Sequence, residues 1–143
     1  MEQRVSLITL GVADLGRARA FYERMGWKGQ ETEGTVFFQL GGMVVCLWGR
    51  DQLAADAGIE DTGGNAGIAI AQNVRSEAEV DEVLRRALDA GATVTRPAAP
   101  TFYGGYAGYF RDLDGHSWEI AYNPSFPLDE DGAITIPDFG ATT

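Results

Sequence analysis

Two copies of one helix-start and helix-end pattern constrain the fold of this chain more than any other feature. Asp14 and Ser76 are residue types that favour the N-cap of a helix, and they lie 62 residues apart. Gly26 and Gly91 are placed to end the helices that follow, and they lie 65 residues apart. Apolar stretches rich in β-branched residues flank both predicted helices. The pattern therefore predicts two half-domains of similar length, each formed by one strand, then a helix, then further strands.

Hydrophobic periodicity predicts the elements of each half. The first helix has an apolar face at helical spacing, formed by Leu15, Ala18, Phe21, Tyr22 and Met25. A Ser76–Glu79 capping box begins the second helix. The predicted strands cover residues 4–12, 35–40 and 43–48 in the first half, and 67–74, 92–97, 105–112 and 116–123 in the second. We expect the strand at 92–97 to end in a proline-rich turn.

The remaining segments are a connection and a tail. Residues 49–65 form a polar linker between the halves, with a possible short helix at 51–57. Residues 124–143 extend beyond the second half, and residues 133–137 could add a short strand there. The prediction is one domain over 1–143, with half one at about 4–48 and half two at about 66–123.

Charge and cysteine content exclude several classes of protein. The net charge is −10, which argues against nucleic-acid and anionic-membrane partners because both require clustered cations. A single cysteine, Cys46, excludes a framework of intramolecular disulfides. The sequence has no signal-peptide pattern and no apolar stretch near the ~20 residues of a membrane span. We expect a cytoplasmic protein.

Two motifs carry a resemblance to a known family. The stretches "LGVADLGRARAFYERMGW" at 10–27 and "GYFRDLDGHSWEIA" at 108–121 resemble signatures of the vicinal oxygen chelate superfamily, which includes glyoxalase I, extradiol dioxygenases and bleomycin-resistance proteins. The resemblance covers residues 4–123. It implies an α+β fold in which two βαβββ repeats form a curved mixed sheet around a central cavity, with helices on the outer face. It also implies a homodimer, by side-by-side pairing or exchange of halves.

The resemblance further implies where a metal would bind. Metal-dependent members hold one divalent cation with four side chains, on the first and last strands of each half. These positions map to about Leu7, Cys46, Gly67 and Glu119, with a register uncertainty of two residues in the middle pair. Only Glu119 is a conventional ligand, and one carboxylate does not hold such an ion. We therefore expect no bound metal and no cofactor.

His116, the only histidine, allows two interpretations. It lies three residues before Glu119, so the two side chains point to opposite faces of a straight strand and cannot chelate together. The favoured interpretation is that His116 forms hydrogen bonds with its own turn. The alternative is general acid–base catalysis, because a histidine at the mouth of a strand titrates near neutral pH.

Alternation along the strands predicts which side chains line the cavity. If Glu119 points inward, Trp118, Ile120 and Tyr122 point toward the helices. The same alternation places small residues at 67, 69 and 71 on the cavity floor. The candidate ligand-binding residues are Leu7, Thr9, Phe37, Gln39, Cys46, Trp48, Tyr103, Tyr106, Tyr109 and Glu119. A mostly apolar concavity with a few polar groups is typical of a small-molecule site.

Three functions remain open at this point. The favoured hypothesis is a metal-independent protein that sequesters an aromatic or cationic small molecule, similar to bleomycin-resistance proteins. The second is a glyoxalase-like lyase, isomerase or dioxygenase that uses Glu119, with or without a divalent metal. The third is a structural or interaction role with a filled interior. The sequence leaves open whether the protein is an enzyme.

Overall fold

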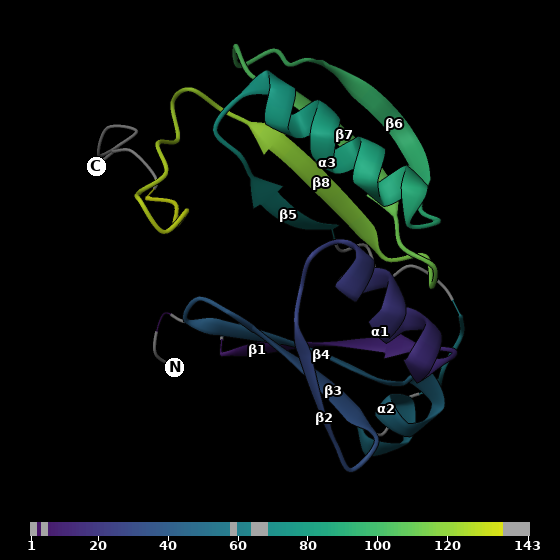
Figure 1. The fold of residues 1–143 in the computed structure, drawn as a ribbon. Helices are drawn as coiled ribbons and strands as arrows, with labels where there is room; N and C mark the ends of the chain where they lie inside the picture. Colours follow the sequence, from purple (N-terminus) through teal and green to yellow (C-terminus); the bar gives the residue numbers. More distant parts are fainter. Residues whose placement is uncertain (1–2, 4–5, 58–59, 64–68, 136–143) are drawn as a thin grey trace, which may run out of the picture.

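The computed structural model describes residues 3, 6–57, 60–63 and 69–135, and it contains two βαβββ units (Figure 1). The first unit consists of β1 (Leu7–Val12), α1 (Leu15–Arg24), β2 (Gly29–Thr32), β3 (Thr35–Leu40) and β4 (Met43–Gly49). A connecting helix, α2 (Arg50–Ala57), follows it. The second unit consists of β5 (Ala69–Asn73), α3 (Glu77–Asp89), β6 (Thr93–Pro100), β7 (Tyr106–Arg111) and β8 (Ser117–Tyr122). The repeat predicted from the spacing of the helix caps is confirmed, as is the short helix in the linker.

The strands form two four-stranded sheets of equivalent topology. The first sheet has the order β1-β4-β3-β2 and the second the order β5-β8-β7-β6. In each sheet the first strand of the unit pairs in parallel with the last, and the other pairs are antiparallel. The α+β class with two βαβββ repeats is thus confirmed.

Both main helices begin and end at the predicted residues. The Asp14 carboxylate accepts a hydrogen bond of 2.8 Å from the backbone N–H of Arg17, and Ser76 Oγ accepts one of 3.1 Å from that of Glu79. Gly26 and Gly91 follow the helices with φ values of 105° and 104°. A residue with a side chain is strained in this left-handed region, so glycine suits both positions.

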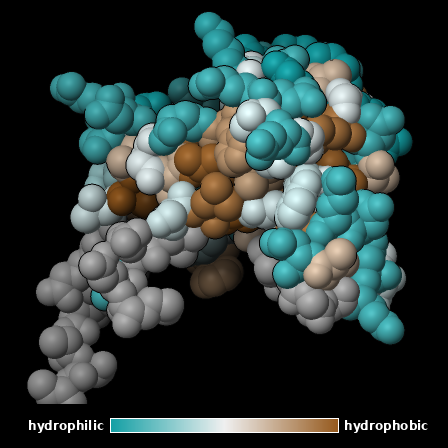
Figure 2. Space-filling view, turned by 90° about the horizontal axis from the view of Figure 1, so that it is seen from below, coloured by the Kyte–Doolittle hydropathy of each residue, from teal (hydrophilic) through white to brown (hydrophobic). Residues whose placement is uncertain are grey.

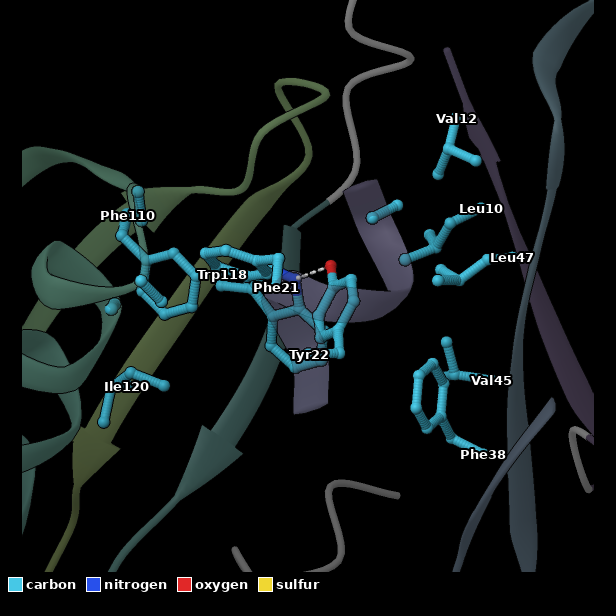
Figure 3. Packing of buried hydrophobic residues seen from close by; sticks show 14 of the residues in the cluster. Leu10, Val12, Phe21, Tyr22, Phe38, Val45, Leu47, Phe110, Trp118 and Ile120 are labelled. Carbon is cyan, nitrogen blue, oxygen red and sulfur yellow. Dashed lines mark hydrogen bonds between the residues drawn. The ribbon is translucent and has the colours of Figure 1, made fainter. Parts of the chain in front are cut away.

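Alternation along the strands places one face of each sheet in a common core. Ile8, Leu10 and Val12 lie on the face of the first sheet that α1 covers, and Trp118 and Ile120 on the corresponding face of the second. Figure 3 shows Phe21 and Tyr22 of α1 between these two sets of side chains. Helix α1 therefore packs against both sheets and joins the two halves. The opposite faces of the two sheets, called the outer faces below, point away from this core.

Two strands differ from the prediction. β2 was not predicted because its sequence, GQET, is polar and three of its four residues are exposed. β6 does not end at Pro97, as predicted, but continues to Pro100. It is the edge strand of its sheet and has irregular register on both sides of Arg96, and edge strands and bulges are where proline is tolerated.

The C-terminal extension contains one contact of the kind found between strands. Leu128 and Ile134 form an isolated antiparallel bridge. The start of the predicted strand at 133–137 therefore pairs within the extension, and the end of that strand lies outside the described residues.

Among the residues that the structure describes, no helix has the length and apolar character needed to cross a membrane.

Candidate functional site

On the outer face of the first sheet, directly paired residues form a row across all four strands. Thr9 pairs with Cys46, Cys46 with Phe37, and Phe37 with Gln30. The Oγ1 atom of Thr9 lies 3.0 Å from Sγ of Cys46, and the Cys46 side chain is buried. This row contains no carboxylate and no basic side chain, and the Thr9 hydroxyl and the Cys46 thiol form a hydrogen bond with each other.

The second sheet has an equivalent row with a different chemistry. Ala71 pairs with Glu119, Glu119 with Tyr109, and Tyr109 with Arg96. The hydroxyl of Tyr109 donates a hydrogen bond of 2.6 Å to Oε2 of Glu119. That bond, with a smaller effect of burial, raises the pKa of Tyr109, so the phenol stays protonated as a donor. The ionisable groups of the outer faces are thus gathered in half two.

Two sets of positions can be examined as a metal site. The resemblance implies Leu7, Cys46, Gly67 and Glu119, but Leu7 provides no donor atom and Gly67 lies outside the described residues. Thr9 and Ala71 occupy equivalent places in the repeat, because each lies five residues before the N-cap of the following helix and each pairs with the last strand of its unit, at Cys46 and Glu119 respectively. Thr9, Cys46, Ala71 and Glu119 are therefore the second set.

This set of donors does not fit a divalent metal. Alanine provides no donor atom, and the hydroxyl of Thr9 and the thiol of Cys46 bind each other. A single carboxylate, Glu119, remains, whereas zinc needs three or four protein ligands and harder cations need several oxygens. No group of three or more His, Cys, Asp or Glu side chains with metal-binding geometry occurs in the described part of the chain.

The other candidate residues of the first half share its outer face. Leu7 pairs with Val44 and Gln39 also pairs with Val44, while Trp48 lies two residues beyond Cys46 on the same face. Leu7 is 42% exposed, and Phe37 and Trp48 are half-buried. Gln39 donates a hydrogen bond of 2.6 Å to the carbonyl of Gly41, so it stabilises the β3–β4 turn. Figure 2, which views the molecule from below the orientation of Figure 1, shows hydrophobic residues gathered near the middle of that face.

One of the predicted tyrosines lies on the other face. Tyr106 pairs with Tyr122 on the side that α3 covers, and its hydroxyl donates a hydrogen bond of 2.8 Å to Asp81 of that helix. Because β7 alternates strictly, Tyr106 and Tyr109 point to opposite faces, and the prediction that Tyr106 lines the site is wrong. Tyr103 lies in the β6–β7 loop, close enough to raise the pKa of Tyr109 slightly.

A cavity of about 570 Å³ lies where the two halves meet. Thr9 and Gly11 contribute from β1, Arg111 and Ser117 from β7 and β8, and α2 and residues 60–63 form a wall. The volume lies within the usual range of small-molecule sites. Of the predicted ligand-binding residues, Thr9 is the one that lines this cavity.

His116 is held by its own turn, as the favoured interpretation expected. Its Nδ1 atom lies 2.7 Å from Oδ2 of Asp112, and its backbone N–H donates to Oδ1 of the same residue at 2.8 Å. Burial alone would lower the pKa of His116, but the hydrogen bond and the charge of Asp112 outweigh burial and raise it. The imidazole also lines the cavity at the seam, where it adds positive charge once protonated.

Two arginines on the outer face of the second sheet were not predicted. Arg111 pairs with Ser117, two residues from Tyr109, and alternation from Tyr109 was enough to find it. The face on which Arg96 lies could not be predicted from the sequence, because it depends on an irregularity in β6. Val94 pairs with Phe110 on the core side, so a regular strand would point Arg96 to that side also.

Comparison with known proteins decides the family. Residues 4–120 match the model of the Glyoxalase/Bleomycin resistance protein/Dioxygenase superfamily. The chain belongs to this superfamily. The resemblance seen in the two sequence motifs is therefore confirmed.

Solved structures of the superfamily are similar over most of the chain. A glyoxalase-related enzyme from Fulvimarina pelagi is 39% identical, with a TM-score of 0.89, and the match covers 94% of this chain and 99% of that one. A lactoylglutathione lyase from Agrobacterium tumefaciens is 25% identical, with a TM-score of 0.65 and coverage of 85% and 94%. The fosfomycin resistance protein FosX from Mesorhizobium loti, at 23% identity, a TM-score of 0.65 and coverage of 86% and 94%, shows the fold alone. None of the curated proteins is similar enough to count as a match.

Proposed function

We propose that this superfamily member is a metal-independent small-molecule-binding protein whose ligand meets the Glu119–Tyr109 pair. The observation that carries the proposal is the donor set at the four equivalent positions, in which Glu119 alone is a conventional metal ligand. A half-buried carboxylate with a phenol donor beside it suits polar contacts to an organic ligand. The apolar outer face of the first sheet suits the body of that ligand, with Phe37 and Trp48 as aromatic surfaces.

The site is proposed to be completed by a second copy of the chain. The core faces of both sheets converge on α1, so the two outer faces of one chain point to different sides (Figure 3). A homodimer would bring the polar outer face of one protomer opposite the apolar face of its partner and would cover Leu7. The free, buried thiol of Cys46 agrees with a cytoplasmic location.

The assembly is tested by light scattering on the purified chain. We expect a dimer, and we expect Leu7→Glu to shift it toward monomer because it introduces a charge into the covered face. Leu88→Glu, on the exposed side of α3 at 54% exposure, is the matched control and leaves the dimer intact. A monomer at all concentrations that still binds ligand would contradict the shared site.

The binding function is tested by a thermal-shift screen followed by calorimetry. Any ligand that binds the native state raises the melting temperature, so we expect stabilisation by compounds with an aromatic body and a polar group. Glu119→Gln and Tyr109→Phe should each weaken the binding of such a compound. Glu23→Gln, on the exposed surface of α1, should not. The proposal fails if no compound of a diverse panel stabilises the protein.

A catalytic function is the second candidate, and the 39% identity with a glyoxalase-related enzyme favours it. In this case Glu119 would act as the general base of a lyase, isomerase or dioxygenase reaction. The test is conversion of the hemithioacetal of methylglyoxal and glutathione to lactoylglutathione, with and without added divalent metal. Turnover that is lost in Glu119→Gln would establish the enzyme, and binding without turnover would favour sequestration.

A further inference from the structure

Arg96 and Arg111 are two cations on the outer face of the second sheet that form no ion pair with any other described residue. Both are exposed, and within the described residues neither guanidinium has an ion pair or a hydrogen bond. Other arginines have partners: Arg19, Arg50 and Arg85 each bind a carboxylate at 2.8 Å or less, and Arg24 donates a hydrogen bond to the carbonyl of Ala90. The net charge of the chain is −10, so carboxylates that could pair with an arginine are abundant. Two neighbouring arginines that lack an ion pair are therefore unusual in this protein.

A register shift in β6 puts Arg96 on this face. Val94 pairs with Phe110 and Arg96 pairs with Tyr109, the next residue of β7 toward its N-terminus. Between these two pairs the chain moves by two residues in β6 but by only one residue in β7, and this mismatch is a β-bulge. Without it, Arg96 would point to the same side as Val94, toward the core, where an unpaired guanidinium is costly. Bulges are found beside functional sites, where they redirect a side chain.

Glu119 does not neutralise either arginine. Its Oε2 atom is bound by the hydroxyl of Tyr109, and no ion pair joins it to Arg96 or Arg111. Arg96 pairs with Tyr109, and Arg111 lies two residues further along β7, about 7 Å away at the usual rise of a strand. The two long side chains therefore flank the Glu119–Tyr109 pair and can reach one group bound above it.

The cavity at the seam adds a second, independent observation. Arg111 lines it together with His116, whose Nδ1 atom lies 2.7 Å from Oδ2 of Asp112. Among the acidic residues of the lining, Asp61 is bound by both Nε and Nη2 of Arg50 at 2.8 Å. Asp114 accepts a hydrogen bond of 2.7 Å from the backbone of Ala13, and its side chain is only 2% exposed. Asp61 and Asp114 therefore each have a donor, and Arg111 is a cation of this lining without an ion pair among the described residues.

We infer that the ligand of this protein carries an anionic group, a carboxylate or a phosphate, which Arg96 and Arg111 bind beside Glu119. Guanidinium groups bind planar carboxylates and phosphates with paired, charge-assisted hydrogen bonds. The inference rests on the proposed small-molecule function and names the ligand class. The sequence predicted an aromatic or cationic ligand. The inference replaces the cationic alternative, which counted Glu119 and the net charge but not the two arginines.

The test uses four probes that share a phenyl ring and differ in charge: benzoate, phenyl phosphate, benzyl alcohol and benzylammonium. Each is titrated into ¹⁵N-labelled protein while the arginine Nε–Hε signals are followed by NMR. The variants Arg96→Gln and Arg111→Gln assign the two signals and remove one guanidinium each. Arg85→Gln, on the exposed surface of α3, is the matched control. All three residues are exposed, so the variants are expected to fold.

The expected result is binding of benzoate or phenyl phosphate that shifts the Arg96 and Arg111 signals and weakens as salt is added. Each site variant should lose about tenfold in affinity, as for one charge-assisted hydrogen bond, whereas Arg85→Gln should lose none. The inference is overturned if benzylammonium or benzyl alcohol binds as tightly as the anions, or if Arg96→Gln and Arg111→Gln bind the anions unchanged. If no probe of any charge binds, the proposed binding function fails and the inference with it.

Discussion

The hydroxyl of Tyr22 donates a hydrogen bond of 2.5 Å to Oδ2 of Asp112 and so joins α1 of the first half to the β7–β8 turn of the second. Asp112 is the buried charged residue of the core, and its carboxylate also accepts from the backbone of Asp114 and from His116. The indole N–H of Trp118 donates to the Tyr22 oxygen at 3.2 Å. One polar network thus links the two repeats within an otherwise apolar core.

Replacement of Tyr22 by Phe should destabilise the protein by about 1–3 kcal/mol, because it leaves a buried carboxylate and a buried indole N–H each without one partner. The measurement is the free energy of unfolding from urea titration. Tyr106→Phe is the matched control: it also removes a tyrosine–aspartate hydrogen bond, but the Asp81 carboxylate of that pair is at the surface, where water replaces the lost donor. Equal losses in the two variants would contradict a structural role for the buried network.

The stability of the protein should decrease as the pH rises above about 6.5. The folded-state pKa of His116 is raised above its ordinary value of 6.5, so protonation of the imidazole stabilises the fold fully below 6.5. This contribution disappears as the pH rises through the folded pKa. For Asp112, burial alone would raise the pKa, but hydrogen bonds from His116 and Tyr22 lower it below 3.8, and its contribution is lost only as the pH falls through that lower value.

The pH dependence is measured as the urea midpoint between pH 5 and pH 9. Because His116 is the only histidine, His116→Gln should give a flatter profile over this range. A wild-type profile that is already flat, or one that His116→Gln leaves unchanged, would show that the Asp112–His116 contact contributes nothing to stability.

The sequence alone was sufficient to predict the repeat and, for most strands, which side chains point toward the core. Asp14, Ser76 and the two helix-ending glycines act locally, so their positions along the chain fixed both helices without knowledge of the rest. The alternation around Glu119 correctly separated Trp118 and Ile120 from the outer face. These features depend on neighbours within a few residues, which a sequence displays directly.

The features that the sequence could not give depend on pairing between distant strands. Arg96 reaches the outer face through a bulge, and a bulge is visible only once β6 is placed against β7. Pro97 suggested the end of a strand, but the edge position of β6 removes the requirement for its N–H. The packing of α1 between both sheets likewise depends on contacts between Tyr22 and residues about 90 positions away.

Replacement of Gly108 by Ala should cost about 1–3 kcal/mol, because the position is already close-packed. A Cβ atom there would lie 2.6 Å from Cδ1 of Leu84 on α3 and 3.0 Å from the backbone nitrogen of Ala98 on β6. Gly42→Ala in the β3–β4 turn is the control, because a Cβ atom at this position meets nothing within 4 Å and its φ is not positive. Urea unfolding of both variants measures the difference, and a loss at Gly42 as large as that at Gly108 would argue against the packing explanation.

The equivalence of the two rows predicts how a metal site could be introduced. Elemental analysis of the untagged protein should find no stoichiometric divalent ion, because Thr9, Cys46 and Ala71 do not supply ligands beside Glu119. The triple variant Thr9→His, Cys46→Glu and Ala71→His would place two imidazoles and a second carboxylate at the paired positions on the first and last strands. We expect it to bind zinc or nickel in calorimetry, whereas the same variant with Glu119→Ala should bind more weakly. If the proposed dimer places the two rows opposite each other, dilution to the monomer should also lower the affinity of the variant for the metal. Wild-type protein that carries one tightly bound ion per chain would overturn the proposed metal independence.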